Sequence, residues 1–562
     1  MQGSVRKSIG TSDFRKLRDV GGYFVDKSLF IKDLWEDAEV ILFPRPRRFG
    51  KTLNLSMLRY FFEKSKEDRS YLFKDLKIWE YQEYQRLMGR FPVIFLTFKD
   101  VKFKSWKDAY SAIQQLISDL FKGFSFLLDS KIMSAEERQA FKRILRKEAP
   151  FSELVVSVYQ LSGLLYRYYN EKVIILVDEY DVPIQAAFSR GYYDDMVDFM
   201  RGFLSAAFKD NSLLAKGVIT GCLRLAKESI FTGMNNLVVY SMLSEYHATA
   251  FGFTEDEVKK LLEDTGLTDH ADLIRQWYNG YIFGGKTLYN PWSILNYVAK
   301  YKDGPRPYWV NTSSNDLIKE LVLDHGVGLK GDMEMLLTDR AIDKQIEENI
   351  VFRDLHANED YVWSLMLFSG YLKTVDFRRQ VRKWIASLKI PNEEVKYIFE
   401  DIFSNWLTQS VGSGRDTDML IKAMIAGDAR EFEIYLGRLM ENSLSYFDTA
   451  KPQPEKVYHA FILGLLVHLT GRYEVRSNPE TGFGRADVVL YPINKTDPGI
   501  IMELKTIDRV YEKTLDAAFE AAAKQVKAQD YVASLHARDV KKIITYLAVF
   551  DGKRVWVRQL DG

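Results

Sequence analysis

The stretch at residues 41–58, "ILFPRPRRFGKTLNLSML", joins a short apolar run to a segment with apolar residues at helical spacing. Between them lie Gly50, Lys51 and Thr52, the last residues of the phosphate-binding pattern G-x-x-x-x-G-K-[ST], which follows a strand and opens a helix. Arg45 occupies the position of the first glycine, and arginine lacks glycine's dihedral freedom, so this loop must curve differently. Three interpretations are open: a nucleotide site, an anion site of another kind, or a basic turn.

A nucleotide site would use the groups of this loop in defined ways. Backbone N–H groups, including that of Gly50, and the start of a helix surround the phosphates. Lys51 would reach the outer phosphates, and the hydroxyl of Thr52 could hold Mg²⁺. Arg47 and Arg48 add positive charge and are candidates for direct phosphate contact.

A second segment supports the nucleotide interpretation. "VIILVDEYD" at residues 173–181 is an apolar run, typical of a buried strand, that ends in two acids. Asp178 would hold Mg²⁺, and Glu179 would activate the attacking water. The ordinary alternative is a solvated strand end, just as Lys51 could be a lysine at the start of a helix.

A third segment, "GVITGCLRLAKES" at residues 217–229, follows in the expected order. Thr220 at the end of a strand is a candidate sensor of the γ-phosphate, and Arg224 is a candidate phosphate contact; the alternative for Arg224 is a surface base. With loop, acid pair and sensor strand in this order, the sequence favours ATP binding. Hydrolysis is the weaker expectation, because the loop departs from the pattern at Arg45.

Composition sets broad limits. The 562 residues are 47% hydrophobic and 28% charged with a net charge of +1, so any surface that binds nucleic acid must be a local patch. A single cysteine, Cys222, excludes an internal disulfide framework and a cysteine-rich zinc site. The polar N-terminus and the lack of an apolar run of about 20 residues predict a cytoplasmic protein without a membrane segment.

The pattern of apolar residues changes along the chain. Buried apolar strands alternate with helices in the first third, which predicts a parallel α/β sheet. From about Gly252 to Ala450 the pattern is mainly helical, and Thr254 with Glu257 forms a capping-box pattern. From about Gln453 the expected order is α-β-β-β-α-β-β, with a hairpin at Asp551-Gly552.

The C-terminal part carries a second set of polar residues. Asp487 begins the strand "RADVVLYP", and Glu503 and Lys505 end the strand "GIIMELKT". Residues two apart on a strand face the same side, so Glu503 and Lys505 project together and Asp487 can lie beside them. Two carboxylates suit Mg²⁺, and a neighbouring lysine can orient a water and offset negative charge. The ordinary alternative for such a pair is a cross-strand ion pair on a solvated face.

Two more side chains complete this set. Glu455, before the first helix of the region, can supply a further carboxylate, and Gln525, on the helix after the strands, can hold the water or a phosphate. The spacing of about fifteen residues between Asp487 and the pair at Glu503, inside an α-β-β-β-α order, predicts metal-dependent phosphodiester hydrolysis. His459 is better explained by packing or hydrogen bonding.

These motifs resemble those of bacterial AAA-ATPase-like proteins of the P-loop (STAND/AAA+) type that carry a C-terminal PD-(D/E)XK nuclease domain. The matching stretches span most of the chain and include "FPRPRRFGKTLNLSML", "VIILVDEYDVP", "WYNGYIF", "YNPWSIL", "YWVNTSSND", "LFSGYL", "GRADVVL", "IMELK" and "AAAKQVKAQDY". In that family the arginine-rich loop is the usual form, so Arg45 does not mark a decayed site. The proline that names the nuclease superfamily is absent before Asp487, which removes no catalytic group.

The resemblance implies a division into four parts: a P-loop domain at 1–250, a winged-helix-like or lid region at 251–350, a helical linker region at 351–450 and a nuclease domain at 451–562. The implied fold class is α/β, with a P-loop NTPase parallel sheet, a mainly helical middle and a PD-(D/E)XK fold. The resemblance gives the nucleotide roles to Lys51, Thr52, Asp178 and Glu179. It gives the nuclease roles to Glu455, Asp487, Glu503, Lys505 and Gln525.

The leading hypothesis is an ATP-binding and ATP-hydrolysing enzyme coupled to Mg²⁺-dependent hydrolysis of nucleic acid, with DNA favoured. Nucleotide-driven movement between the P-loop domain and the middle region would position or license the nuclease. The alternative is a nucleotide-switched regulator that binds DNA or protein with little or no cleavage. The pairing of an ATPase with a nuclease fits defence against foreign DNA and mobile-element biology equally well, and a homo-oligomer is compatible with both hypotheses.

Overall fold

The structure is a computed structural model that describes residues 4–225, 230–231, 233–309, 316–337, 339–350, 352–355, 358–380, 383–400, 402, 415–443, 455–466, 469, 472–477, 488–507, 514–527 and 531–560. The chain divides into two compact units. The first unit comprises Met1–Ile318 and Asp343–Val395, and the second comprises Lys319–Ile342 and Lys396–Gly562. The four-part division expected from the sequence stays a prediction.

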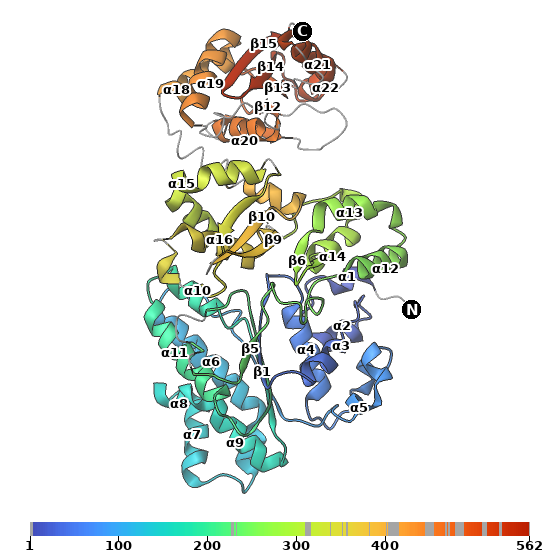
Figure 1. The fold of residues 1–562 in the computed structure, drawn as a ribbon, viewed down its shortest axis with the longest axis vertical. Helices are drawn as coiled ribbons and strands as arrows, with labels where there is room; N and C mark the ends of the chain where they lie inside the picture. The colour runs from blue at the N-terminus through green and yellow to red at the C-terminus, as the bar shows by residue number, and fades with distance from the viewer. Residues whose placement is uncertain are drawn as a thin grey trace. The chain divides into compact units, whose positions relative to one another are not determined.

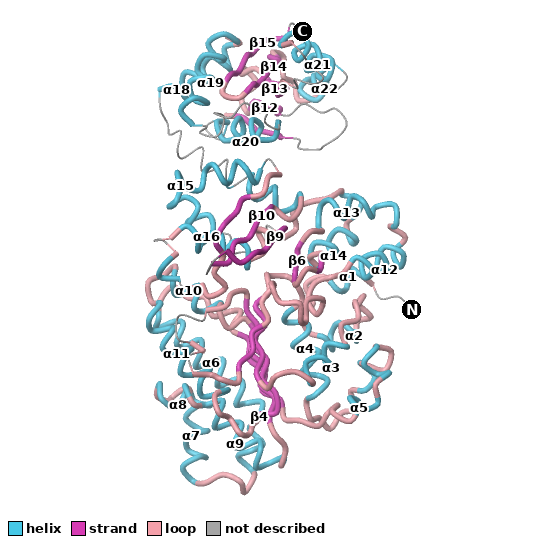
Figure 2. Tube along the Cα trace, viewed as in Figure 1, coloured by secondary structure: helices cyan, strands magenta, loops and turns pink. Residues whose placement is uncertain are grey.

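A parallel sheet forms the centre of the first unit (Figure 2). It has five strands in the order β2-β3-β4-β1-β5. Its strands are β1 (Val40–Pro44), β2 (Val93–Thr97), β3 (Val173–Asp178), β4 (Leu214–Gly221) and β5 (Leu237–Val239). Every residue of β1 and β3 is buried, as expected for parallel strands covered on both faces. This confirms the predicted α/β class and the predicted strands β1 to β4, whereas β5 was not anticipated.

Helices cover both faces of this sheet (Figure 1). On one side lie α2 (Phe14–Asp19), α3 (Leu29–Trp35) and α4 (Lys51–Phe62), preceded by α1 (Val5–Ser8) and followed by α5 (Gln82–Gln85). The other side carries α6 (Trp106–Gly123), α7 (Ala135–Arg146), α8 (Phe151–Val155), α9 (Ser157–Tyr169), α10 (Val182–Phe188) and α11 (Tyr193–Phe208). Because β1, β4 and β3 are neighbouring parallel strands, their carboxyl ends lie at the same end of the sheet. The loop after β1 and the acids at the end of β3 therefore lie close together.

The rest of the first unit adds a small helical cluster and a second sheet. The cluster consists of α12 (Glu255–Thr265), α13 (Ala271–Tyr278) and α14 (Pro291–Ala299), with the hairpin β6 (Tyr281–Phe283) and β7 (Lys286–Leu288). The predicted capping box is present at the start of α12, where the side chains of Thr254 and Glu257 each bond to the other's backbone N–H. The core of this cluster includes Val258, Leu261, Ile274, Tyr278, Ile294 and Tyr297.

A three-stranded sheet in the order β8-β10-β9 lies within the region that the sequence suggested to be mainly helical. Its strands are β8 (Ile342–Gln345), β9 (Lys373–Gln380) and β10 (Lys383–Lys389), and α16 (Glu359–Phe368) precedes β9. The strands β9 and β10 pair in antiparallel fashion. Residues 393–400 form a helix that follows Pro391. α15 (Asp316–Leu337) crosses the boundary between the two units at Ile318.

The second unit contains a five-stranded sheet in the order β11-β12-β13-β14-β15. Its strands are β11 (Tyr473–Ser477), β12 (Val488–Pro492), β13 (Gly499–Thr506), β14 (Ile543–Asp551) and β15 (Arg554–Leu560), and only β13 and β14 run parallel. The accompanying helices are α18 (Arg415–Ala426), α19 (Ala429–Ser443), α20 (Glu455–Leu466), α21 (Leu515–Lys527) and α22 (Tyr531–His536). The predicted order of elements is found except that two helices, α21 and α22, lie where one was expected. The hairpin turns at Gly552-Lys553, where Asp551 pairs with Arg554.

Among the helices of the described ranges, none combines the length and apolar character needed to cross a membrane.

Candidate functional site

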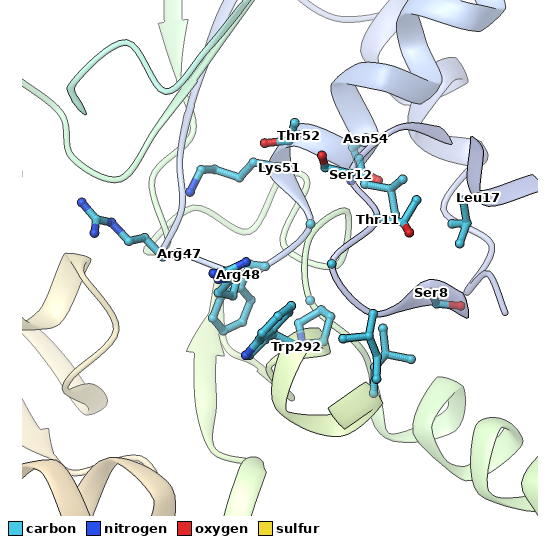
Figure 3. A pocket seen from close by; sticks show the side chains of 18 of the residues that line it. Ser8, Thr11, Ser12, Leu17, Arg47, Arg48, Lys51, Thr52, Asn54 and Trp292 are labelled. Carbon is cyan, nitrogen blue, oxygen red and sulfur yellow. The ribbon is translucent and has the colours of Figure 1, made fainter. Parts of the chain in front are cut away.

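A cavity of about 500 Å³ opens beside the loop between β1 and α4 (Figure 3). This volume is in the range typical of small-molecule and cofactor sites. The lining comes from the N-terminal segment, the loop itself, the segment after β2 and the start of α14. The charged lining residues are mostly basic: Lys27, Arg47, Arg48, Lys51, Lys99 and Lys102, against Asp100 and Glu179. Such an excess of positive charge suits a polyanionic ligand.

The loop reaches α4 through two residues with left-handed backbone conformation. Arg48 has φ 68° and Gly50 has φ 87°. Gly50 is the N-cap of α4, and glycine adopts this conformation without steric cost, whereas a bulky arginine does so only when its surroundings enforce it. The 12-residue helix α4 then begins at Lys51, so its N-terminal dipole and free N–H groups point into the loop.

Arg45, at the position of the missing glycine, belongs to the core of the domain. It is completely buried and donates to the carbonyls of Pro44 (3.0 Å) and Tyr240 (2.5 Å). Its guanidinium also lies over the rings of Phe251 and Phe283. Burial lowers the pKa of Arg45 to about 9, which still leaves it charged at neutral pH. Arg45 therefore fastens the start of the loop to its surroundings and does not line the cavity.

Lys51 is bound on several sides. Its Nζ donates to the carbonyls of Arg45 (3.0 Å) and Pro46 (3.2 Å), and it lies 3.3 Å from Oε1 of Glu179. Burial by itself lowers the pKa of Lys51, but the neighbouring Cys222 and the acids of the site outweigh it and raise that pKa overall. The side chain is only 3% exposed, so Lys51 is a fixed ammonium group at the floor of the loop.

Asp178 is surrounded by three threonine hydroxyls from three different elements. Its Oδ2 accepts from Thr52 of α4 (2.9 Å) and from Thr97 of β2 (3.1 Å), and its Oδ1 accepts from Thr220 of β4 (2.8 Å). Burial, and secondarily the charge of Glu179, raises the pKa of Asp178. The parallel sheet thus brings together four positions that are far apart in the sequence.

Glu179 follows directly and points toward Lys51. It has a left-handed backbone with φ 55°, an unfavourable conformation for a non-glycine residue. Its Oε1 pairs with Lys51, while Oε2 is buried without a hydrogen-bond partner in the described part of the chain. Glu179 also lines the cavity. A buried carboxylate oxygen without a partner has hydrogen-bonding capacity left for a ligand or a water.

The two residues predicted on the third segment lie elsewhere around the loop. Thr220 is fully buried behind Asp178 and does not line the cavity. Arg224 lies 3.5 Å from Glu348, and its carbonyl accepts from the backbone N–H of Ile350. Arg224 is also absent from the cavity lining, so in this structure it holds the segment after β8.

The two remaining arginines of the loop, Arg47 and Arg48, both line the cavity, but in different surroundings. The guanidinium of Arg48 stacks over the ring of Trp292 at 4.2 Å (Figure 3). Arg47 donates to the side chain of Gln185 on α10 at 3.2 Å. Both side chains can therefore contribute charge to a ligand, with Trp292 and Gln185 fixing their positions.

Asp181, the last acid of "DEYD", is a further buried carboxylate beside the loop that was not predicted. Asp181 is fully buried and accepts from the backbone N–H groups of Cys222 (2.9 Å) and Leu223 (3.0 Å). Burial, followed by the charge of Glu179, raises the pKa of Asp181 to about 6. A Cβ atom at Gly221 would lie 2.6 Å from Oδ1 of Asp181, so only glycine fits there. The repeated acid in the motif was the available signal.

A second missed group lies behind the loop. Glu394 is fully buried and accepts from the hydroxyl of Ser293 and from the backbone N–H of Trp309. The indole of Trp309 in turn donates to the carbonyl of Arg47 at 3.3 Å. Burial raises the pKa of Glu394 to about 8. Ser293 and Trp309 thus act, through Glu394, as supports of the loop, which no spacing in the sequence indicates.

The predicted nuclease residues centre on β13. Glu503 is fully buried in this strand, and Lys505 is partly exposed two residues later. The Nζ of Lys505 donates to Oε1 of Gln525 on α21 at 3.2 Å. Residues two apart on a strand share a face, so Glu503, Lys505 and Gln525 are directed to the same side of the sheet.

Two members of this predicted set are not placed. Asp487 lies outside the described residues, directly before β12, and β12 begins with Val488 opposite Met502 of β13. Glu455 is the first residue of α20, but its side chain lies outside the described part. Their predicted roles therefore stay predictions.

The residues present fit Mg²⁺ better than a softer metal. In the described ranges no three side chains of the His, Cys, Asp or Glu type cluster as a preformed metal site. At the loop, the hydroxyl of Thr52 and the carboxylate of Asp178 offer oxygen atoms 2.9 Å apart. Mg²⁺ prefers oxygen ligands, keeps several waters and is commonly bound by one or two protein groups together with phosphate oxygens.

Two regions of the chain match protein-family models. Residues 8–231 match the AAA-ATPase-like family, described as "Predicted AAA-ATPase", and residues 453–560 match a family of the PD-(D/E)XK nuclease superfamily. The chain is also 27% identical over 425 residues to "Uncharacterized protein in vnfD 5'region" of Azotobacter chroococcum mcd 1. That alignment covers 75% of this chain and 74% of the relative.

Proposed function

We propose that this chain, which combines an AAA-ATPase-like domain with a PD-(D/E)XK nuclease domain, is an ATP- and Mg²⁺-dependent nuclease that acts on DNA. The observation that carries the proposal is the contact between Thr52 and Asp178 at the floor of a cationic cavity. It joins the end of the phosphate-binding loop to the acid of β3, as nucleotide binding requires.

The nucleotide half of the reaction follows from the geometry of the loop. The N–H groups at the start of α4 and the ammonium of Lys51 bind the phosphates of ATP, and Arg47 and Arg48 add charge. Thr52 and Asp178 would hold Mg²⁺, which neutralises charge on the phosphate oxygens. Ion binding at Asp178 would favour its carboxylate form and so offset the effect of burial on its pKa.

Hydrolysis requires Glu179 to leave Lys51. In the structure the carboxylate of Glu179 pairs with the ammonium at 3.3 Å. Phosphate oxygens that bind Lys51 would compete for that ammonium, which frees Glu179 to accept a proton from the attacking water. The buried Oε2 of Glu179, which faces no partner among the described residues, is the oxygen we assign to that proton transfer.

The nuclease half centres on β13. Glu503 and Asp487 would hold Mg²⁺, whose role is to stabilise negative charge on the phosphodiester and to lower the pKa of a water. Lys505 orients that water and offsets charge in the transition state, and Gln525 fixes the ammonium of Lys505. Glu455 is proposed as a further carboxylate of the same site.

The test measures two activities of the full chain: phosphate release from ATP, and cleavage of single- and double-stranded DNA with Mg²⁺. Glu179→Gln should abolish ATP turnover, and Asp487→Ala and Lys505→Ala should abolish cleavage but leave ATP turnover intact. Cleavage by Asp487→Ala or Lys505→Ala at the wild-type rate would rule out the nuclease assignment. ATP turnover by Glu179→Gln at the wild-type rate would rule out the assigned base.

One observation favours a second candidate, a nucleotide-switched binding protein without turnover. Glu179 is held by Lys51 and by an unfavourable backbone conformation, so it needs a rearrangement before it can act as a base. If ATP binds tightly to the wild-type protein and no phosphate is released in the presence or absence of DNA, this second candidate replaces the first.

A further inference from the structure

The hairpin of β9 and β10 is a strongly basic segment of the first unit, and none of its residues lines the cavity beside the loop. Residues 373–389, "KTVDFRRQVRKWIASLK", contain six lysines and arginines and one acid, whereas the whole chain has a net charge of +1. The two strands run side by side as an antiparallel pair (Figure 1). This concentration of charge is a local patch of the kind that attracts phosphate.

The hairpin also carries an exposed aromatic stack. The rings of Phe377 and Trp384 lie 4.8 Å apart and within 4° of parallel. Although Phe377 covers one side of the indole, Trp384 remains 46% exposed. Exposing the apolar surface of an indole to water costs free energy. Exposed aromatic surface of this kind is typical of a binding site.

Charge and aromatic surface share one face of the hairpin. Arg379 lies directly opposite Trp384 in the strand pairing, and it shares a face with Phe377, two residues earlier. The side chain of Arg379 is exposed, and it forms no side-chain hydrogen bond or ion pair with another described residue. In contrast, the charge of Arg378 is already compensated by Asp376 and Asp343.

We infer that this face, formed by Phe377, Arg379 and Trp384, binds single-stranded nucleic acid. Unpaired bases expose flat faces that stack on aromatic rings, and their phosphates pair with adjacent cations. A duplex hides its base faces, so it offers the indole no stacking surface. For its biological meaning the inference rests on the proposed nuclease function, because such a face would hold a strand for the nuclease domain.

The test is the binding of short fluorescein-labelled oligothymidylate and oligouridylate to the full chain, followed by fluorescence anisotropy with EDTA present so that no cleavage occurs. Wild-type protein should bind both single strands more tightly than a duplex of similar length; comparison of the two strands separates DNA from RNA. Trp384→Ala should weaken binding roughly 10-fold or more, as expected for the loss of one stacked base, whereas Trp384→Phe should retain most of it.

The charge is tested separately. Arg379→Ala should weaken binding and lower the slope of log Kd against log salt by roughly 0.7, the contribution of one contact to a single-stranded phosphate. The matched control is Lys142→Ala, which removes one exposed charge from α7 and should bind like the wild type.

Wild-type affinity in Trp384→Ala and in Arg379→Ala, or an equal loss of affinity in the Lys142→Ala control, would overturn the inference and leave this face to another partner such as an acidic protein. No detectable binding of single strands by the wild type would overturn it as well. The binding outcomes do not depend on catalysis: binding without cleavage would contradict only the proposed function, and cleavage by a wild type that binds no single strand would contradict only the inference.

Discussion

The loop around Lys51 and the strand β13 both carry charged side chains in largely buried surroundings, but they are assembled differently. At the loop, Asp178 is held by hydroxyls from α4, β2 and β4, so every contact joins residues far apart in the sequence. On β13, Glu503 and Lys505 are two residues apart, and Gln525 follows on the next described helix.

The difference shows two ways of fixing a charged group. The parallel sheet of the first unit collects strand ends at one edge, so a change in strand order would disperse the site. On β13 the alternation of side chains along one strand fixes the pair, so only a shift in strand register would disperse it. Substitutions at the loop should therefore affect both binding and stability, while substitutions around β13 should affect chemistry alone.

The largest expected effect is at Lys51. Lys51→Ala should weaken ATP binding at least about 100-fold, because it removes a charged donor to phosphate, and should leave Glu179 buried without its ion-pair partner. Titration calorimetry measures the affinity. Lys286→Ala, an exposed lysine on β7, is the control and should bind ATP normally. If Lys51→Ala binds ATP as tightly as the parent does, the loop is only a basic turn and not a nucleotide site.

At Arg45 of the same loop, the expected effect is on the stability of the fold. Arg45→Ala removes the donors to the carbonyls of Pro44 and Tyr240 and leaves a cavity, at a cost of about 3 kcal/mol in the free energy of unfolding. Urea unfolding followed by tryptophan fluorescence measures the loss, with the exposed Arg86→Ala as control. A variant of unchanged stability that binds ATP poorly would instead make Arg45 a ligand contact.

The buried carboxyl of Glu394 should make the free energy of unfolding depend on pH. Because its pKa is raised from 4.5 to about 8 in the folded protein, the folded state holds a proton that the unfolded state releases above pH ~4.5. Its contribution to stability is therefore complete below pH ~4.5 and decreases as the pH rises through about 8, by up to about 1.4 kcal/mol per pH unit. Glu394→Gln cannot ionise, so the stability of the wild type relative to this variant should fall over that window. A constant difference would contradict a buried neutral carboxyl.

A smaller effect is expected at Gln525, on the β13 side of the comparison. Gln525→Ala removes the acceptor of the Lys505 ammonium, which should slow DNA cleavage about 10-fold through the loss of one positioning hydrogen bond. Single-turnover cleavage and urea unfolding are measured together. The free energy of unfolding should be unchanged. A large loss of stability would show that this contact is structural, and β13 would then no longer differ from the loop in this respect.

The smallest effect is expected at Arg48. Its guanidinium stacks on Trp292 and is partly open to solvent, so Arg48→Ala should weaken ATP binding only about 5-fold. Arg48→Lys, which keeps the charge but stacks less well, separates the two contributions. If Arg48→Ala binds like the parent while Lys51→Ala does not, the arginine serves only to shape the loop.

Several features of the fold could be predicted from local patterns alone. Apolar runs identified β1 to β4, and the capping-box pattern identified the start of α12. Spacing along a strand indicated that Glu503 and Lys505 project together. These features depend on interactions within a few residues, so the sequence carries them directly. The strands β9 and β10 were missed, because their exposed charged residues lack the alternation of a half-buried strand.

The sequence by itself determined that a loop with the phosphate-binding pattern G-K-T, an acid pair and a polar strand end occur in that order. Only the tertiary structure decided that Arg45 turns into the core, that Arg224 pairs with Glu348, and that Trp309 supports the loop from a segment more than 250 residues away. The physical reason is that a side chain's role depends on its desolvated partners. Those partners come from strand order and helix packing, which are properties of the folded chain and not of neighbouring residues.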